Sequence, residues 1–307
     1  MRQGCPICGG PGAIEAYGRI APFILELRSG PRDGPRDTAL RRCDTCDLTY
    51  FAHRFDADTL DAMYSGYRDD RYLSIRRSWE PWYSRKTNSA TKPGSEAAAE
   101  RTEFMTEVVG AHTDIDNLRN IVDYGGDEGQ FFPAGYRGRK YVIEVSGKNL
   151  VEGVQAASTL DELPDRPHLV IAAHLLEHLV DPLAVVFEIR AAVADDGLFY
   201  VEVPLDRPKV HPWHAGPHYR LFLKWVSAFR FSWVVLDFIT GVARNFGRGV
   251  PRLGTVKQSE HINYFSTRSL RTLLTRGGFR VVSTASDATA SVGGLRMGRL
   301  GALAVPA

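Results

Sequence analysis

The four cysteines of this 307-residue chain form two closely spaced pairs. They occur as Cys5-Pro-Ile-Cys8 and Cys43-Asp-Thr-Cys46, which is C-x2-C-x34-C-x2-C, and no other cysteine is present. In a reducing compartment this pattern favours a metal over disulfides. Four thiolates in two such pairs satisfy a tetrahedral structural zinc ion and leave no open coordination position for catalysis. The sequence therefore predicts a structural zinc site formed by Cys5, Cys8, Cys43 and Cys46.

A second stretch with chemical potential is IVDYGGDEGQF, residues 121–131. It contains the acidic residues Asp123 and Asp127 and the turn-forming residues Gly125, Gly126 and Gly129. The apolar start predicts a buried strand, and the glycines allow a tight turn close to a ligand before a predicted helix. A carboxylate in this loop would repel a pyrophosphate, whereas a cofactor that carries an ammonium group tolerates it. An ordinary strand-to-helix turn is the alternative interpretation.

A glutamate ends the next predicted strand, about 20 positions after the glycine loop, where nucleotide-binding α/β sheets place the carboxylate that accepts from ribose hydroxyls. Glu144 is therefore the predicted ribose ligand, with a surface glutamate as the alternative. Only residues 146–152 separate this strand from the following one, which is too short for the usual helix. We expect the adenine pocket at residues 157–160, with Leu160 in its wall.

The stretch LVIAAHLLEHLVDP, residues 169–182, places His174, Glu177 and His178 directly after a buried strand. Taken alone, H-x-x-E-H matches the inverted zinc-protease pattern, in which two histidines on one helix hold zinc. Asp181-Pro182, however, predicts a new helix start just downstream and leaves little room for a long zinc-binding helix. We therefore expect His174 to line the cofactor or substrate site, with Glu177 and His178 orienting it or capping the backbone.

Taken together, these motifs resemble the class I S-adenosylmethionine-dependent methyltransferases that carry an N-terminal zinc-binding module, as in sugar and natural-product pathways. The loop resembles the family's D-x-G-x-G-x-G motif, with Asp127 where the middle glycine is common. Residues 174–182 resemble its H-x-L-E-H-x-x-D-P segment, and SEHINYFS with GFRV, residues 259–266 and 278–281, resembles its E-H-x-x-x-F-S and G-F-x-V segments. The four elements occur in family order over nearly the whole chain.

The resemblance implies S-adenosylmethionine as the cofactor and zinc as a structural ion. The cofactor ligands that follow from it are Asp123, Gly125, Gly126, Asp127, Gly129, Glu144, Leu160 and His174. In some zinc-containing sugar C-methyltransferases a Tyr or His near position 261 removes the substrate proton, so the candidate catalytic residues are His174, His178, His261 and Tyr264. A neutral histidine can accept a proton near pH 7, although His261 could instead hold a turn through a hydrogen bond.

Two further expectations concern neighbouring chemistry. Related ubiquinone-pathway O-methyltransferases carry an E-x-x-E-H pattern linked to a divalent cation. Here His174 replaces the first glutamate, which speaks against a second metal. The histidines of residues 207–259, which are His211, His214 and His218, are less favoured candidates for proton handling.

The elements that position these residues follow from the hydrophobic pattern. Short apolar strands are predicted at residues 120–124, 140–145, 154–157, 169–172, 197–203, 279–286 and 300–305, with helices between several of them. This alternation predicts an α/β fold with a doubly wound, mostly parallel seven-stranded sheet, Rossmann-like as in class I methyltransferases. Ser266 is a predicted N-cap and Gly277-Gly278 a predicted C-cap of the helix between them. A weak strand is predicted at residues 21–27, between the cysteine pairs.

The expected domains are a zinc-binding module at 1–55, a helical linker or cap at 56–112, and the methyltransferase domain at 113–307. Residues 207–259 interrupt the strand alternation with many aromatics and histidines. Because they follow a strand's carboxyl end, where open α/β sheets bind ligands, they are predicted to form a helical lid insertion.

Composition bounds the remaining possibilities. The chain is 44% hydrophobic with a formal charge of +2, so overall charge predicts no nucleic-acid or membrane partner, although local patches remain possible. The interval between the cysteine pairs is not strongly basic, which disfavours a nucleic-acid-binding ribbon. The N-terminus lacks a signal-like apolar region, so a cytoplasmic location is expected. Residues 231–243 are too short for a transmembrane segment and predict a buried or interfacial helix.

The function that these features predict is methyl transfer from S-adenosylmethionine to a small polar acceptor, such as a nucleotide-linked sugar or a polysaccharide or natural-product precursor. Two alternatives belong to other classes. One is a catalytically inactive zinc-containing binding or scaffold protein on the same fold, and the other is a nicotinamide-dependent oxidoreductase.

Overall fold

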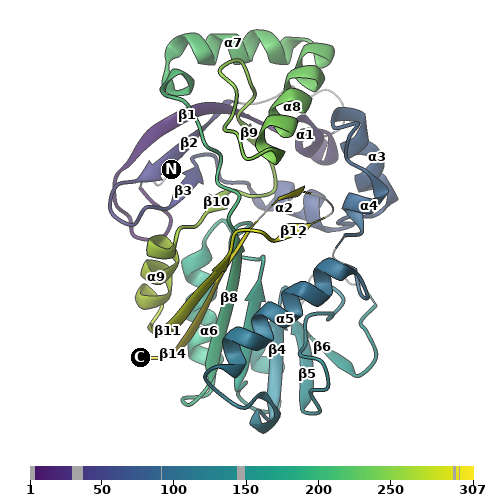
Figure 1. Ribbon diagram of the computed structural model, residues 1–307, viewed down its shortest axis with the longest axis vertical. Helices are drawn as coiled ribbons and strands as arrows, with labels where there is room; N and C mark the ends of the chain where they lie inside the picture. Colours follow the sequence, from purple (N-terminus) through teal and green to yellow (C-terminus); the bar gives the residue numbers. More distant parts are fainter. Residues whose placement is uncertain (1–3, 30–36, 91, 144–148, 293–294, 297) are drawn as a thin grey trace.

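A computed structural model describes residues 4–29, 37–90, 92–143, 149–292, 295–296 and 298–307 (Figure 1). Its larger sheet has the strand order β11-β14-β8-β7-β4-β5-β6. These strands are β4 (Asn120–Tyr124), β5 (Arg139–Ile143), β6 (Val154–Ala157), β7 (Leu169–Ala173), β8 (Leu198–Pro204), β11 (Phe279–Asp287) and β14 (Arg299–Pro306). Strand β14 runs antiparallel to both of its neighbours, β11 and β8. The five strands that come first in the sequence, β4 to β8, pair in parallel. The predicted mostly parallel seven-stranded sheet of a class I methyltransferase is confirmed.

Helices cover both faces of this sheet, as a doubly wound fold requires. On one face α5 (Glu96–Gly110) packs Met105, Val108 and Val109 against Ile121 and Ile171 of the sheet. On the other face lie α6 (Pro182–Ala192) and α9 (Thr267–Arg276). The predicted helix starts are confirmed, because Asp181 and Ser266 each accept a hydrogen bond from a backbone N–H of the first turn.

One predicted helix is absent. The glycine loop was expected to lead into a helix, but residues 125–138 between β4 and β5 contain only turns and irregular backbone. Gly129, Gly135 and Pro133 interrupt this segment, and the two glycines have φ of 77° and 79°, which no right-handed helix accommodates. The described residues between β5 and β6 likewise contain no helix, as their short length predicts.

A second sheet joins distant parts of the chain in the order β10-β3-β2-β1-β9. Its central strands are N-terminal, namely β1 (Gly12–Ile20), β2 (Asp37–Cys43) and β3 (Thr49–Phe51). Its edges are β9 (Lys257–Gln258) and β10 (Asn263–Tyr264), which pair with β1 and β3. The N-terminal segment therefore completes its sheet only with residues 257–258, at the end of the insertion, and 263–264, just after it.

The segment predicted as a weak strand at 21–27 is instead the helix α1 (Pro22–Ser29). Pro22 occupies the first helical position, where its missing N–H has no cost. Phe23, Ile24 and Leu27 are all at most 4% exposed, and their spacing buries one helical face against the neighbouring helices. The strand prediction was wrong because a short run of apolar residues fits the periodicity of a helix as well as that of a strand.

The remaining elements surround the two sheets (Figure 1). Helices α2 (Ala57–Tyr64), α3 (Asp70–Trp79) and α4 (Arg85–Asn88) precede α5. The insertion contributes η3 (Pro212–Ala215), α7 (Pro217–Ala228) and α8 (Arg230–Asn245). Minor elements are η1 (Ile115–Asn117), η2 (Leu160–Glu162), β12 (Ser291–Val292) and β13 (Leu295–Arg296). In the described ranges, no helix has the length and apolar character needed to cross a bilayer.

The two sheets are joined through shared packing and through one buried arginine. Cys5 and Tyr50 belong to the same apolar cluster as Val186 of α6 and Leu270 of α9. Arg54, directly after the N-terminal strands, donates to the carbonyl oxygens of Leu179 and Val180 at 2.7 and 2.8 Å and to Asn263 Oδ1 at 2.9 Å. Burial lowers the pKa of Arg54 to about 10, so it stays charged at neutral pH. The cysteine-bearing segment is thus fixed against the backbone that follows His178.

Candidate active site and metal centre

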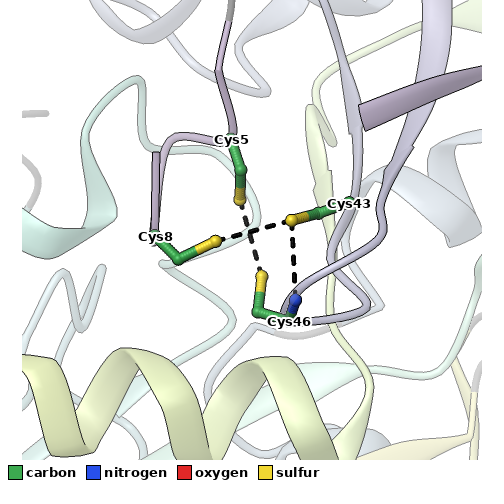
Figure 2. Close-up of side chains that lie close together, drawn as sticks. All are labelled: Cys5, Cys8, Cys43 and Cys46. Carbon is green, nitrogen blue, oxygen red and sulfur yellow. Dashed lines mark hydrogen bonds between the residues drawn. The ribbon is translucent and has the colours of Figure 1, made fainter. Parts of the chain in front are cut away.

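The four cysteine side chains converge on one point (Figure 2). The Sγ atoms of Cys5 and Cys46 lie 3.5 Å apart, and those of Cys8 and Cys43 lie 3.4 Å apart. All four sulfurs fall within 4.8 Å of one another. The backbone N–H of Cys46 also points to Cys43 Sγ at 3.5 Å, as in a metal-binding knuckle.

This donor set fits zinc. A tetrahedral ion with Zn–S bonds of about 2.3 Å needs four sulfurs roughly 3.8 Å apart, close to the spacing observed. Without a cation, neighbouring thiols cannot all ionise. The hydrogen bond from Cys46 lowers the pKa of Cys5 to about 5, and the same contact raises the pKa of Cys46. A divalent cation would remove this conflict, because it allows all four thiols to ionise.

The glycine loop follows β4 with left-handed backbone at alternate positions. Gly125, Asp127 and Gly129 have φ of 77°, 55° and 77°. This conformation costs a residue with a Cβ about 1–2 kcal/mol, and Asp and Asn tolerate it best among such residues. Asp127 therefore occupies the middle-glycine position with the backbone that a glycine would adopt.

The loop also folds back onto its own strand. A Cβ at Gly126 would lie 2.3 Å from Cγ of Asp123, which is 1% exposed. A Cβ at Gly125 would lie 2.9 Å from Leu175 Cδ1, so the loop contacts the residue that follows His174. Because the glycines carry no side chain, they allow a tightly packed turn at the carboxyl end of β4, where a nucleotide-type cofactor binds in open α/β sheets. The residues present fit such a cofactor.

The two other predicted cofactor ligands have different outcomes. Glu144, the predicted ribose ligand, lies outside the described residues. Leu160 begins η2 and is 5% exposed, in the cluster that contains Ile143 of β5 and Leu176. Their roles toward the cofactor stay predictions.

His174 is held between two buried carboxylates at the carboxyl end of β7. Its Nε2 lies 3.0 Å from Glu202 Oε1 and its Nδ1 lies 3.3 Å from Glu177 Oε1. Its backbone is left-handed with φ of 55°, and its N–H donates to the Glu202 carbonyl at 2.8 Å. Strain of this kind costs about 1–3 kcal/mol and persists where surrounding contacts over-determine the geometry. Because both ring nitrogens already face acceptors, His174 is better placed to form the wall of the site than to accept a proton.

Glu202 lies in β8 at 1% exposure and organises this side of the site. Tyr200 donates its hydroxyl to Glu202 Oε2 at 2.9 Å, and Arg101 of α5 lies 3.3 Å from Oε1. Burial alone would raise the pKa of Glu202, but the hydrogen bond from His174 and the charge of Arg101 lower it to about 2. Arg101 in turn lies 4.2 Å from the ring centroid of Phe131, at the end of the glycine loop. One ion pair therefore ties α5 and the loop to His174.

His178 and His261 form a contacting pair with fixed orientations. Their ring centroids are 4.8 Å apart at an interplanar angle of 76°. His178 Nδ1 lies 3.2 Å from the Glu260 carbonyl, so this nitrogen is the donor and Nε2 carries the lone pair. His261 Nδ1 lies 2.7 Å from Asp206 Oδ2.

The surroundings of His178 and His261 shift their pKa values in opposite directions. Burial lowers the pKa of His178 to about 4, despite the charge of Glu177. Burial would also lower the pKa of His261, but the charge and hydrogen bond of Asp206, with Glu177 and Glu260, raise it to about 9. At neutral pH, His178 is therefore the neutral member of the pair and His261 the cationic one. This separation is typical of groups that divide acid and base roles.

Glu177, His178 and His261 offer a second set of donor atoms within 4.8 Å of one another. Glu177 is fully buried, and neither carboxylate oxygen accepts a hydrogen bond of good geometry, although His174 and His178 lie nearby. Two imidazoles and a carboxylate are also a donor set of divalent transition metals. The expectation that no second metal binds here stays a prediction, tested below.

The other candidate residues have local roles. Tyr264 is 5% exposed, its ring packs on Phe51, and its hydroxyl lies 3.3 Å from the His261 carbonyl. His214 is fully buried and uses one nitrogen for the His211 N–H and the other toward the Pro251 carbonyl. His218 stacks on Trp213. These contacts favour packing and capping roles, and the catalytic assignments stay predictions.

Sequence reasoning missed four acidic and basic groups of the site, which are Arg101, Glu202, Asp206 and Glu260. Signals for two existed, because Glu202 is the only charged residue in the strand sequence LFYVEVP and Glu260 begins the E-H-x-x-x-F-S segment. The other two lie on a helix and in a loop, where a charged residue is ordinary. Arg76 of α3 adds a further contact to Glu260, with Nη1 3.2 Å from Oε2.

Comparison with known proteins assigns the family. Residues 95–284 match the family model described as a methyltransferase domain, a span of more than half the chain. The chain belongs to this family and is a class I S-adenosylmethionine-dependent methyltransferase. No curated protein matches the sequence.

Several solved structures match this chain at low identity and low TM-score. The mitomycin 7-O-methyltransferase MmcR is 17% identical over 76% of this chain with a TM-score of 0.37, and this chain spans 60% of its length. The N-methyltransferase NodS from Bradyrhizobium japonicum WM9, in complex with S-adenosyl-L-homocysteine, is 12% identical over 69% of this chain and 89% of its own, with a TM-score of 0.41. The N-terminal domain of EvdMO1, in the presence of S-adenosyl-L-homocysteine and D-fucose, is 14% identical over 70% and 84%, with a TM-score of 0.37.

The zinc assignment predicts one metal ion per chain. Cys5→Ser or Cys46→Ser is expected to lose the ion and lower the melting temperature, because both positions lie in the core shared with α6 and α9. Metal analysis and thermal unfolding test this, with Asp44→Ser in the same turn as an exposed control. Stoichiometric zinc and wild-type melting in both cysteine variants would refute the site. A second metal equivalent that is lost in His178→Ala would instead assign a cation to the Glu177 group.

The left-handed loop predicts opposite effects of two substitutions at Asp127. Asp127→Gly is expected to keep or raise stability, and Asp127→Val to lose about 1–2 kcal/mol, because a β-branched residue tolerates this backbone poorly. Urea unfolding measures both. Equal stabilities would show that the backbone at 127 relaxes freely.

The Asp206–His261 pair predicts a pH dependence of stability. Since the folded-state pKa of about 9 exceeds the unfolded value near 6.5, the contribution is fully present below pH 6.5 and is lost as pH rises through 9. The loss is about 3 kcal/mol, at 1.36 kcal/mol per pKa unit. Asp206→Asn should flatten this limb relative to wild type in urea unfolding between pH 6 and 10. An unchanged limb in the variant would exclude the pair as its origin.

Proposed function

We propose that this methyltransferase acts on a small polar acceptor, of the class of nucleotide-linked sugars or polysaccharide and natural-product precursors, and that His178 receives the acceptor's proton. The observation that carries the proposal is the His178–His261 pair beside His174, at the edge of the sheet where the glycine loop also ends. Polar side chains converge there from four separate segments, which suits a hydrophilic acceptor.

The methyl donor limits what the protein has to do. When bound, S-adenosylmethionine supplies an already electrophilic methyl group, so the chain contributes alignment and proton removal. The acceptor's oxygen, nitrogen or carbon forms a bond to the methyl carbon, the methyl–sulfur bond breaks, and S-adenosylhomocysteine leaves. The proton released by the acceptor needs a neutral base close to the reacting atom.

His178 fits the base role in this proposal. Its Nδ1 is committed to the Glu260 carbonyl, which leaves the Nε2 lone pair as its acceptor. Its lowered pKa keeps it neutral at physiological pH, although a low pKa also makes it a weak base. The adjacent Glu177 carboxylate, 3.8 Å from Nε2, stabilises the imidazolium that forms. This stabilisation partly compensates for the low basicity of His178.

His261 has a positioning role in the same proposal. Its charge is compensated by Asp206, which lies at the start of the insertion, and its ring contacts that of His178. The insertion is thereby linked to the base through a single side chain. A shift of residues 206–207 on acceptor binding would move His261 against His178.

One observation favours metal binding as a second role for Glu177, His178 and His261. The buried Glu177 oxygens accept no hydrogen bond of good geometry, and both histidines have their Nδ1 atoms fixed by second partners, as is common for metal-binding histidines. A divalent cation held there would bind the acceptor directly. Metal stoichiometry in His178→Ala distinguishes the two roles.

Calorimetry with S-adenosylmethionine tests the cofactor step. We expect binding by the zinc-loaded wild type, loss of binding in Gly126→Ala because its Cβ would collide with Asp123, and normal binding in Gly110→Ala, whose Cβ meets open space. No binding at millimolar cofactor would sink the enzymatic proposal, and binding of NAD instead would favour an oxidoreductase.

The acceptor class and the base are tested together by S-adenosylhomocysteine release over a panel of nucleoside-diphosphate sugars. With an accepted sugar, His178→Ala should lower turnover at least about 100-fold while cofactor affinity is unchanged, the usual scale of a lost general base. Undiminished turnover in this variant would exclude His178, and turnover of none of the panel would exclude this acceptor class.

A further inference from the structure

The outer sides of α7 and α8 carry rows of exposed apolar side chains. On α7 and its end these are Leu221, Trp225 and Phe229, at 67, 61 and 56% exposure. On α8 and its end they are Phe231, Val235, Phe238, Ile239, Val242 and Phe246, from 37% exposed at Val235 to 81% at Phe231. Their spacing of three or four residues places each row on one helical face.

These rows are not the faces that fold the insertion. The buried side of α7 is formed by Tyr219, Leu223 and Val226, and that of α8 by Trp233, Asp237 and Thr240. Each helix therefore has its own packed face and, in addition, an apolar face in contact with solvent. Soluble monomers rarely expose contiguous apolar patches beyond a few hundred Å², and larger ones mark binding surfaces.

The segment that carries these rows is strongly positive in sequence. Residues 207–252 contain eight lysines and arginines and a single acidic residue, Asp237, a net charge of +7. Because the whole chain carries +2, the remainder carries −5. Asp237 is 4% exposed and pairs with Lys257 at 2.6 Å, so it offers no negative charge at the surface. Seven of the basic residues are exposed, namely Lys209, Arg220, Lys224, Arg230, Arg244, Arg248 and Arg252.

The surface lies at an extremity of the molecule. In Figure 1, α7 forms the end opposite the seven-stranded sheet along the longest axis, and α8 descends from it. A flat partner can therefore approach α7 without meeting the methyltransferase sheet. The surface also connects to the site, because Arg244 of α8 donates to the Asp206 carbonyl at 3.0 Å and Asp206 holds His261.

We propose that the α7–α8 surface docks onto an anionic lipid membrane, with the aromatic rows in the acyl boundary and the basic residues at the headgroups. Helices with Trp, Phe and Leu on one side and Lys and Arg around them bind the membrane interface in this manner. A second copy of the chain docked through the same face would bring another +7 against it, and nucleic acid would leave the apolar rows uncovered. An anionic membrane satisfies both the charge and the apolar surface.

The test is sedimentation of the zinc-loaded full chain with vesicles of equal parts phosphatidylglycerol and phosphatidylcholine, against phosphatidylcholine alone. We expect binding to the anionic vesicles that weakens with salt. The triple variant Trp225→Ser, Phe231→Ser, Phe246→Ser should reduce it at least about tenfold. Lys224→Glu with Arg248→Glu should do the same, because it replaces two attractive charges at the headgroups with repulsive ones.

Phe187→Ser on α6 is the matched control, because Phe187 is 51% exposed on a helix outside the insertion. It should bind like wild type, and melting curves of all variants establish that they fold. Absent binding to anionic vesicles would overturn the proposal, as would unchanged binding of the triple variant. Self-association in sedimentation velocity that the triple variant abolishes, without vesicle binding, would assign the face to a second copy instead. These readouts do not depend on methyl transfer, so the docking surface and the proposed acceptor can fail separately.

Discussion

The burial of Glu177 and Glu202 is the constraint on which the site depends. Both carboxylates are almost fully removed from solvent at the carboxyl ends of neighbouring strands, and the pKa of each is nevertheless lowered. A buried charge persists only where cationic or donor groups compensate it. His174 lies between the two, Arg101 comes from α5, and the histidine pair comes from two other segments. Each of these elements is thereby fixed relative to the sheet, and the left-handed backbone of His174 is the local consequence.

The N-terminal module satisfies a related constraint on the backbone. Residues 174–179 form no regular element, so their carbonyl groups lack the partners that a helix or sheet would supply. Arg54 and Asn263 donate to these carbonyls, and the Glu177 carbonyl accepts from the Ile262 and Asn263 N–H groups. The irregular turn that carries Glu177 and His178 is therefore stabilised from outside the methyltransferase sheet. This gives the cysteine-bearing segment a structural role in the site without a catalytic ligand of its own.

Much of the fold could be predicted because its signals are local. The strands around 121 and 170 are continuous apolar runs, and Asp181 and Ser266 are ordinary N-caps. Where two local signals conflicted, prediction failed, as for Pro22–Ser29 and for the helix expected after Gly129. In the site, the cysteine cluster and the His178–His261 proximity agree with the sequence motifs. Glu202, Asp206 and Glu260 could not be ranked, because their importance arises from burial and from contacts between distant segments. Net charge was similarly uninformative, since the charge of +7 on residues 207–252 is concealed by an acidic remainder.

The composition of the second sheet also has a consequence for synthesis on the ribosome. Strands β1 and β3 emerge first, yet β9 and β10, which cover their edges, are encoded about 200 residues later. At translation rates of about 5–20 residues per second, both edges stay unpaired for roughly 10–40 s, and open strand edges invite aggregation. The cysteine pairs lie within the segment already synthesised. A metal ion captured early by the four cysteines would order the N-terminal chain during this interval, so the proposed zinc site bears on the yield of folded protein as well as on its stability.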